Sequence, residues 1–111
     1  MAHRLSPDKG KLLENAVFLE LRRRKHNIFF YKTANNLEVD FYLPDYEKQL
    51  IQVCFEIDQY NTFEREIRSI TTAMDETGSR NGIILTYNTN DILERGKYKI
   101  KIMPAWKWFL D

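Results

Sequence analysis

Residues 37–57 constrain the fold most strongly, because they contain two stretches of alternating residue type around a short turn. A period of two residues is typical of a β-strand with one buried face. With the turn at residues 44–48, the two strands should lie side by side. Leu37, Val39, Phe41 and Leu43 should face the core from the first strand, and Ile51, Val53, Phe55 and Ile57 from the second. The opposite face should carry Glu38, Asp40, Tyr42, Gln52, Cys54 and Glu56.

Carboxylates in the middle of both strands predict a functional site on this polar face. Charged groups are normally kept out of the centre of a sheet unless they are paired or bind a metal ion.

A first helix is predicted from Ser6, a candidate N-cap followed by Pro7 and an acidic residue, to about Arg24. With about 100° of rotation per residue, its apolar face consists of Leu13, Val17, Phe18 and Leu21. Glu14 falls inside this face. A carboxylate there is paired, protonated, metal-bound or at the edge of a pocket. The structural alternative is a side chain that reaches solvent from the border of the stripe.

The first helix should end in a basic cluster, residues 22–26, with the sequence RRRKH. Cations suit the negative end of the helix dipole, and we favour this structural interpretation. A contact with nucleic-acid phosphates is the alternative. His26 has no ligand-like spacing around it and is interpreted as a surface histidine.

The remaining segments predict a strand at residues 28–33, a second helix from Asn61 to Gly78, a central strand at 82–87 and a turn at 88–91. An edge strand protected by alternating lysines is expected at 97–102. A short helix should start at Pro104 and pack Trp108 or its aromatic neighbours, Trp106 and Phe109, into the core; base stacking on exposed tryptophans is the alternative. The order α-β-β-β-α-β-β-α predicts an α/β domain with a small mixed sheet flanked by helices.

The 111 residues suit a single domain, 1–111, with a core of its own. The formal net charge of +1 provides no overall field that attracts nucleic acid, so any basic surface must be local. One cysteine permits no internal disulfide, which favours a reducing compartment, the cytoplasm. No apolar run reaches the length of a membrane span, and no signal peptide is recognised.

Several passages together resemble the PD-(D/E)xK, or restriction-endonuclease-like, nuclease superfamily. They are KGKLLENAVFLELRRR, LEVDFYLP, LIQVCFEI, EREIRSI and KIKIMPAWKWFL. Within that superfamily the chain is similar to the nuclease-like domain of unknown function at the C-terminus of bacterial and archaeal AAA-type ATPases. The resemblance implies an αβββαββ core with a short C-terminal helix. No GxxxxGK[ST] loop occurs, so an ATPase motor would lie outside this sequence.

The resemblance also implies a catalytic set of Glu14, Asp40, Gln52 and Cys54, in which Glu14, Asp40 and Gln52 would bind Mg²⁺. Such an ion acidifies a bound water and neutralises phosphate charge. The motif is degenerate, because Gln52 stands at the acidic position and Cys54 at the lysine position. Glu56 could replace the lost carboxylate, and Lys32 or Arg65 could supply the lost cation, although Arg65 should lie opposite the apolar face of its helix.

Three functions therefore remain open from the sequence. The favoured one is a nuclease-like domain that associates with DNA, or serves an ATPase as an accessory domain, with weak or no cleavage. The alternatives are an active Mg²⁺-dependent DNA endonuclease and a purely structural or protein-interaction module.

Overall fold

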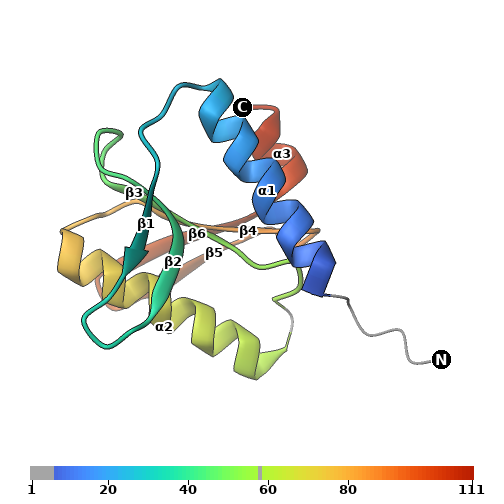
Figure 1. Ribbon diagram of the computed structural model, residues 1–111. Helices are drawn as coiled ribbons and strands as arrows, with labels where there is room; N and C mark the ends of the chain where they lie inside the picture. The colour runs from blue at the N-terminus through green and yellow to red at the C-terminus, as the bar shows by residue number, and fades with distance from the viewer. Residues whose placement is uncertain (1–6, 58) are drawn as a thin grey trace.

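In residues 7–57 and 59–111, which the computed structural model describes, the chain forms a six-stranded mixed sheet with helices on both faces (Figure 1). The elements are α1 (Pro7–Arg23), β1 (Phe29–Lys32), β2 (Glu38–Leu43), β3 (Gln49–Val53), α2 (Tyr60–Thr77), β4 (Gly82–Thr86), β5 (Asp91–Arg95), β6 (Tyr98–Pro104) and α3 (Ala105–Phe109). The strand order is β1-β2-β3-β4-β6-β5. The predicted α/β class, the mixed sheet and the short closing helix are confirmed.

The sheet is antiparallel at both edges and parallel in the middle. β2 pairs antiparallel with β1 and β3, whereas β3, β4 and β6 run parallel, and β5 returns antiparallel to β6. Parallel neighbours need a crossover connection, and α2 supplies it between β3 and β4. β4 is buried along its whole length, as its continuous apolar run predicts.

Each face of the sheet buries its own apolar cluster. One cluster lies beneath α1 and α3 and includes Val17, Leu21, Ile51, Leu85 and Trp108. The other lies beneath α2, whose buried residues include Ile67, Ile70, Ala73 and Met74. The amphipathic patterns of the two long helices therefore face the sheet as the sequence predicts.

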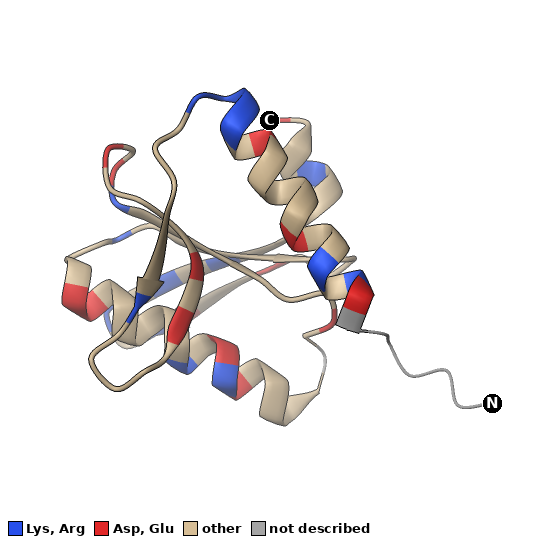
Figure 2. Ribbon diagram, viewed as in Figure 1, with Lys and Arg blue, Asp and Glu red and all other residues tan. Residues whose placement is uncertain are grey.

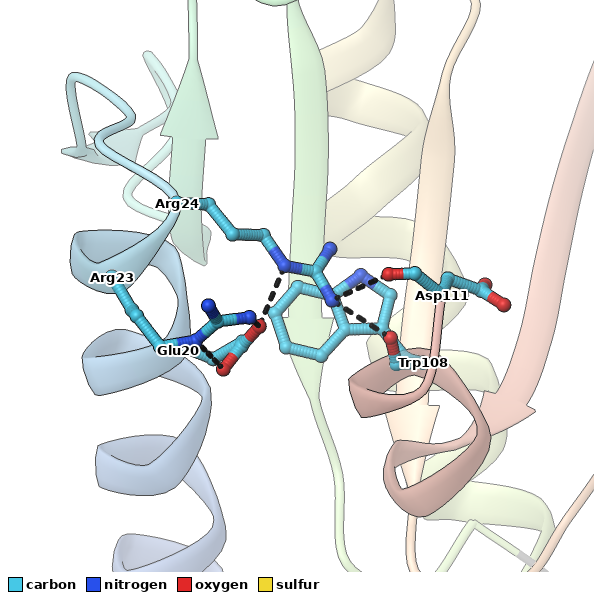
Figure 3. A network of polar contacts seen from close by, with 5 residues as sticks. All are labelled: Glu20, Arg23, Arg24, Trp108 and Asp111. Carbon is cyan, nitrogen blue, oxygen red and sulfur yellow. Dashed lines mark hydrogen bonds and ion pairs between the residues drawn. The ribbon is translucent and has the colours of Figure 1, made fainter.

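Arg24 ties the end of α1 to α3 (Figure 3). Its Nε donates to Glu20 Oε2 at 2.7 Å, its terminal nitrogen donates to the carbonyl of Trp108 at 3.0 Å, and its guanidinium lies 4.5 Å from the Trp108 ring. Glu20 also pairs with Arg23 at 2.6 Å. Arg22 lies 5.9 Å from the centre of the Phe18 ring, so all three arginines predicted at this helix end have intramolecular partners.

Trp108 is buried, whereas Trp106 is exposed, so the closing helix provides one tryptophan anchor. His26 lies with its ring 4.7 Å from that of Tyr46 and is half-buried.

Several predicted boundaries were wrong. The segment at 97–102 is not an edge strand, because β5 pairs with it and forms the edge of the sheet. A two-residue turn connects the two strands, and it contains Gly96 at φ +56°. α2 begins at Tyr60 with Gln59 at its N-cap, so Asn61 does not cap it, but Gly78 ends it at φ +76° as predicted. The strand expected to reach residue 57 ends at Val53. The predicted N-cap Ser6 lies outside the described residues.

The predicted alternation of β2 was wrong at its centre. Phe29 of β1 pairs with Tyr42 of β2, and Tyr31 pairs with Val39. The two residues on β1 are two positions apart, whereas their partners on β2 are three positions apart. β2 therefore holds one extra residue, a β-bulge, at Asp40 or Phe41. As a result Val39 joins the cluster beneath α2, while Phe41 joins the cluster beneath α1.

Candidate functional site

The candidate site lies where β2 and β3 separate. Their main-chain pairing extends from Leu43 and Gln49 to Phe41 and Ile51, and the next residues in register would be Asp40 and Gln52. Beyond that point β3 stays with β4, because Val53 pairs with Leu85.

In this gap, hydrogen bonds made by side chains take the place of the main-chain hydrogen bonds between β2 and β3. Gln52 Oε1 accepts the Asp40 N–H at 2.8 Å, and Gln52 Nε2 donates to the Glu38 carbonyl at 3.1 Å. In return, Asp40 Oδ2 accepts the Val53 N–H at 2.8 Å. Asp40 and Gln52 thus each bond the main chain of the opposite strand, and both hold the separated strands together.

Asp40 is an acid in an environment that disfavours its charge. Burial raises the pKa of Asp40 to about 7, and the Val53 N–H opposes this shift. The charges of Glu14 on α1, Glu66 on α2 and Glu38 on β2 raise the same pKa further. Acidic residues on all three of these elements are red in Figure 2. Carboxylates of the helices on both faces of the sheet therefore contribute to the raised pKa of Asp40.

The charge of Glu14 acts on Asp40 and raises its pKa. Glu14 is half-buried and lines an open pocket of about 300 Å³ with Lys11, Asn15, Phe18 and Phe41, and Asp40 does not line this pocket. A shared site of Glu14 and Asp40 therefore stays a prediction.

Cys54 follows the end of β3, with its side chain packed against the cluster beneath α2. Burial raises the pKa of the Cys54 thiol to about 12, and the carboxylates of Glu66 and Asp40 act in the same direction. The Cys54 Sγ donates to the Glu56 carbonyl at 3.1 Å. At neutral pH this position carries an uncharged thiol.

Glu66 is the residue that reasoning from the sequence missed. Its side chain is 14% exposed, and burial raises its pKa, while hydrogen bonding by Gln52 and the charge of Arg65 lower it. On α2 it follows Phe63 by three residues and precedes Ile70 by four, which places it at the border of the apolar face. This was a detectable signal, of the same kind as that of Glu14.

Of the proposed substitutes for the lost acid and lysine, Arg65 acts on residues of the site, because its charge lowers the pKa of both Cys54 and Glu66. Glu56 is exposed and follows the end of β3, and Lys32 is exposed at the end of β1 opposite Glu38. The Arg65 side chain is 67% exposed, with its Nε 3.7 Å from Glu66 Oε2. Arg65 therefore faces mostly away from the core, as its place on the helical wheel predicts.

The donors in the gap do not fit Mg²⁺ in this arrangement. Mg²⁺ requires a near-octahedral set of oxygen ligands. Asp40 Oδ2 and Gln52 Oε1 already accept main-chain N–H groups, and within the described residues no three His, Cys, Asp or Glu side chains are grouped to hold a metal ion. Mg²⁺ binding and the catalytic roles of Glu14, Asp40, Gln52 and Cys54 stay predictions.

The fold and this gap define the chain as an α/β domain in which buried polar side chains bridge two separating strands of a mixed sheet. Residues 9–108 match the family described as "Domain of unknown function (DUF4143)", and the chain belongs to this family.

One curated relative, the uncharacterized protein MJ1544 of Methanocaldococcus jannaschii, is 40% identical over 114 residues, which cover 95% of this chain. The match spans 26% of the relative's length. No solved structure gives a significant match. Among the described residues, none of the helices combines the length and apolar character that crossing a membrane requires.

Proposed function

We propose that the chain is a nuclease-like domain that associates with DNA as an accessory unit of an ATPase and that cleaves weakly or not at all. The observation that carries this proposal is the hydrogen bonding of Asp40 and Gln52. Both side chains are occupied by the main chain of the opposite strand, at 2.8 Å in each direction. Groups that must hold the fold are poorly placed to rearrange around a metal ion and a substrate.

The chemistry at Cys54 supports the same conclusion. In the resemblance this position belongs to a lysine that supplies positive charge near the phosphate. A thiol whose pKa is about 12 is neutral and supplies none. The cations considered as substitutes, Lys32 and Arg65, are both exposed, and solvent screens an exposed charge, so electrostatic stabilisation of the transition state would be weak.

The link to an ATPase rests on the resemblance in sequence and on length. The nuclease-like domains that the sequence resembles lie at the C-terminus of AAA-type ATPases. The relative from Methanocaldococcus jannaschii is about four times as long as its match to this chain, since the match spans 26% of it. We therefore propose that the domain acts beside a larger partner region that contains the motor.

A cleavage assay tests this proposal. Plasmid and single-stranded DNA would be incubated with the wild-type chain and with Asp40→Asn, in Mg²⁺ and in Mn²⁺. The expected result is equal background cleavage by both proteins. Efficient cleavage, with complete turnover of the DNA, that requires metal and is lost in Asp40→Asn would overturn the proposal.

A second candidate, the Mg²⁺-dependent endonuclease, is favoured by one observation. The carboxylates of Glu14, Glu66 and Glu38 all raise the pKa of Asp40, and a divalent cation would relieve their mutual repulsion. Titration with Mg²⁺, followed by NMR of the side-chain carboxyl groups, distinguishes the two candidates. Saturable shifts at both Glu14 and Asp40 would favour the endonuclease, and unchanged spectra at millimolar metal would favour the accessory domain.

A further inference from the structure

Three hollows adjoin at the amino-terminal ends of the parallel strands, and the same residues line neighbouring hollows. The first, about 200 Å³, shares Arg80 and Lys99 with a second of about 460 Å³. It shares Gln49, Ile83 and Lys101 with a third of about 210 Å³. The three hollows therefore form a continuous depression across this end of the sheet.

Four exposed cations border the depression, and we call them the basic band: Arg80, Lys97, Lys99 and Lys101. Lys97 pairs with Asp75 at 3.3 Å. Among residues 7–57 and 59–111, the ion pairs include none made by Arg80, Lys99 or Lys101. Glu94 lies opposite Lys99 on β5 but does not line a hollow. The band thus holds three cations without an acidic partner.

The spacing of these cations suits a chain of phosphates. Lys99 and Lys101 alternate with buried Ile100 and Ile102, so both project from the same face of β6. Residues two apart on a strand are separated by roughly 6.6 Å, close to the spacing of successive phosphates on an extended nucleic-acid strand. Basic residues on the strands of this half of the sheet are blue in Figure 2. We propose that the basic band binds the phosphate backbone of a nucleic acid, independently of base sequence.

A nucleic acid fits this surface better than an acidic protein does. Tight protein interfaces are centred on a large apolar or aromatic anchor in a desolvated pocket. Here the first hollow is lined by polar and apolar surface in nearly equal parts, and its exposed apolar side chain is Ile92 at the edge of the sheet, with no buried aromatic anchor. Interfaces with nucleic acid are polar, positively charged and wet, which matches an open, cation-lined depression.

The basic band begins at the amino-terminal ends of the parallel strands, whereas the Asp40 gap lies toward their carboxyl ends. Lys101 is in register with Ile83 of β4, which is in register with Ile51 of β3, so Lys101 lies one residue before the row of Gln52 and two strands away from β3. Asp40 lines none of the three hollows. This inference rests on the DNA-association part of the proposed function and is independent of whether the gap cleaves.

Fluorescence anisotropy with a labelled single-stranded oligonucleotide of mixed sequence tests the inference across a range of salt concentrations. The variant R80Q/K99Q/K101Q should bind at least about 10-fold more weakly than wild type, with the salt dependence reduced by about one unit of slope per cation removed. The matched control K9Q/R68Q/K107Q removes three exposed cations that line none of the three hollows and should bind like wild type. Urea denaturation of both variants verifies that the fold is retained.

Three outcomes would overturn the inference. Equal losses in the two triple variants would show that only total charge matters, and an unchanged affinity in R80Q/K99Q/K101Q would remove the band from the interface. If polyglutamate bound to the band in place of the oligonucleotide, the band would be a binding site for an acidic protein. The cleavage assay with Asp40→Asn is independent of all three, so failure here is distinguishable from failure of the proposal that the gap does not cleave.

Discussion

The two ends of the parallel strands differ in what their polar side chains do. At the carboxyl end, Asp40 and Gln52 are largely buried and bond the main chain of neighbouring strands. At the amino end, Lys99 and Lys101 are exposed and form no ion pair within the described part of the chain. The first end therefore contributes to stability, and the second is available for a partner.

This difference indicates that Asp40 and Gln52 serve the fold by bonding the main chain of neighbouring strands. The bulge in β2 opens a gap between β2 and β3, and the gap exposes main-chain groups that need partners. Asp40 and Gln52 supply those partners. Two glutamines on β3, Gln49 and Gln52, therefore have different expected roles, although they are three residues apart on the same strand.

The largest expected effect comes from Gln52→Leu. The substitution leaves the Asp40 N–H and the Glu38 carbonyl without partners in a largely buried place, which should lower the free energy of unfolding by about 2–4 kcal/mol. Gln49→Leu is the matched control, since the Gln49 side chain forms no hydrogen bond within the described part of the chain, and it should change stability by less than about 0.5 kcal/mol. Urea denaturation measures both. Equal effects of the two substitutions would contradict the difference between the two ends.

A smaller effect is expected in the reactivity of Cys54. Because burial raises the pKa of this thiol to about 12, little thiolate exists at pH 8 in the folded chain. Alkylation by iodoacetamide should be at least about 100-fold slower in the folded protein than in the same protein unfolded in urea. The chain has one cysteine, so the rate reports this position alone. Similar rates in both states would show an accessible, ionised thiol and would revive a chemical role for Cys54.

The smallest expected effect is the pH dependence due to Asp40. The pKa of Asp40 is about 7 when folded, against about 3.9 for an unfolded aspartate. Between these values the unfolded chain loses the proton first, so the free energy of unfolding falls as the pH rises from about 4 to 7 and stays lower above 7. Asp40→Asn keeps an oxygen for the Val53 N–H and removes this penalty.

Urea denaturation at pH 4 and pH 8 checks this prediction. Asp40→Asn should be more stable than wild type by about 1–2 kcal/mol at pH 8, and the difference should shrink toward pH 4. Asp91→Asn, at an exposed position on the edge strand, is the control and should change neither value appreciably. A variant that is less stable than wild type at pH 8 would mean that the charged form of Asp40 is favoured, as it would be in a site prepared for a metal ion.

Short-range patterns in the sequence determined the succession of helices and strands and the burial of Val17, Ile70 and Trp108. They also identified Asp40 and Gln52 as neighbours, because two adjacent strands with a short turn have few registers available. Period, capping and turn signals act over a few residues and are readable without knowing which elements pair. Gly96 is a turn signal of this kind. The strand before it, β5, was not predicted, because its residues are mostly exposed.

Only the tertiary structure decided what Asp40 and Gln52 do. Three features depend on contacts between segments that are distant in the chain. They are the bulge that changes which way the β2 side chains face, the hydrogen bonds from Asp40 and Gln52 to the opposite strand, and the placement of Glu66 on α2 near Asp40. The continuity of the basic band likewise depends on the placement of β6 beside β4. Local periodicity specifies which residues share a face, but packing between layers decides which charges are buried, and burial decides whether a carboxylate holds the fold or remains free for chemistry.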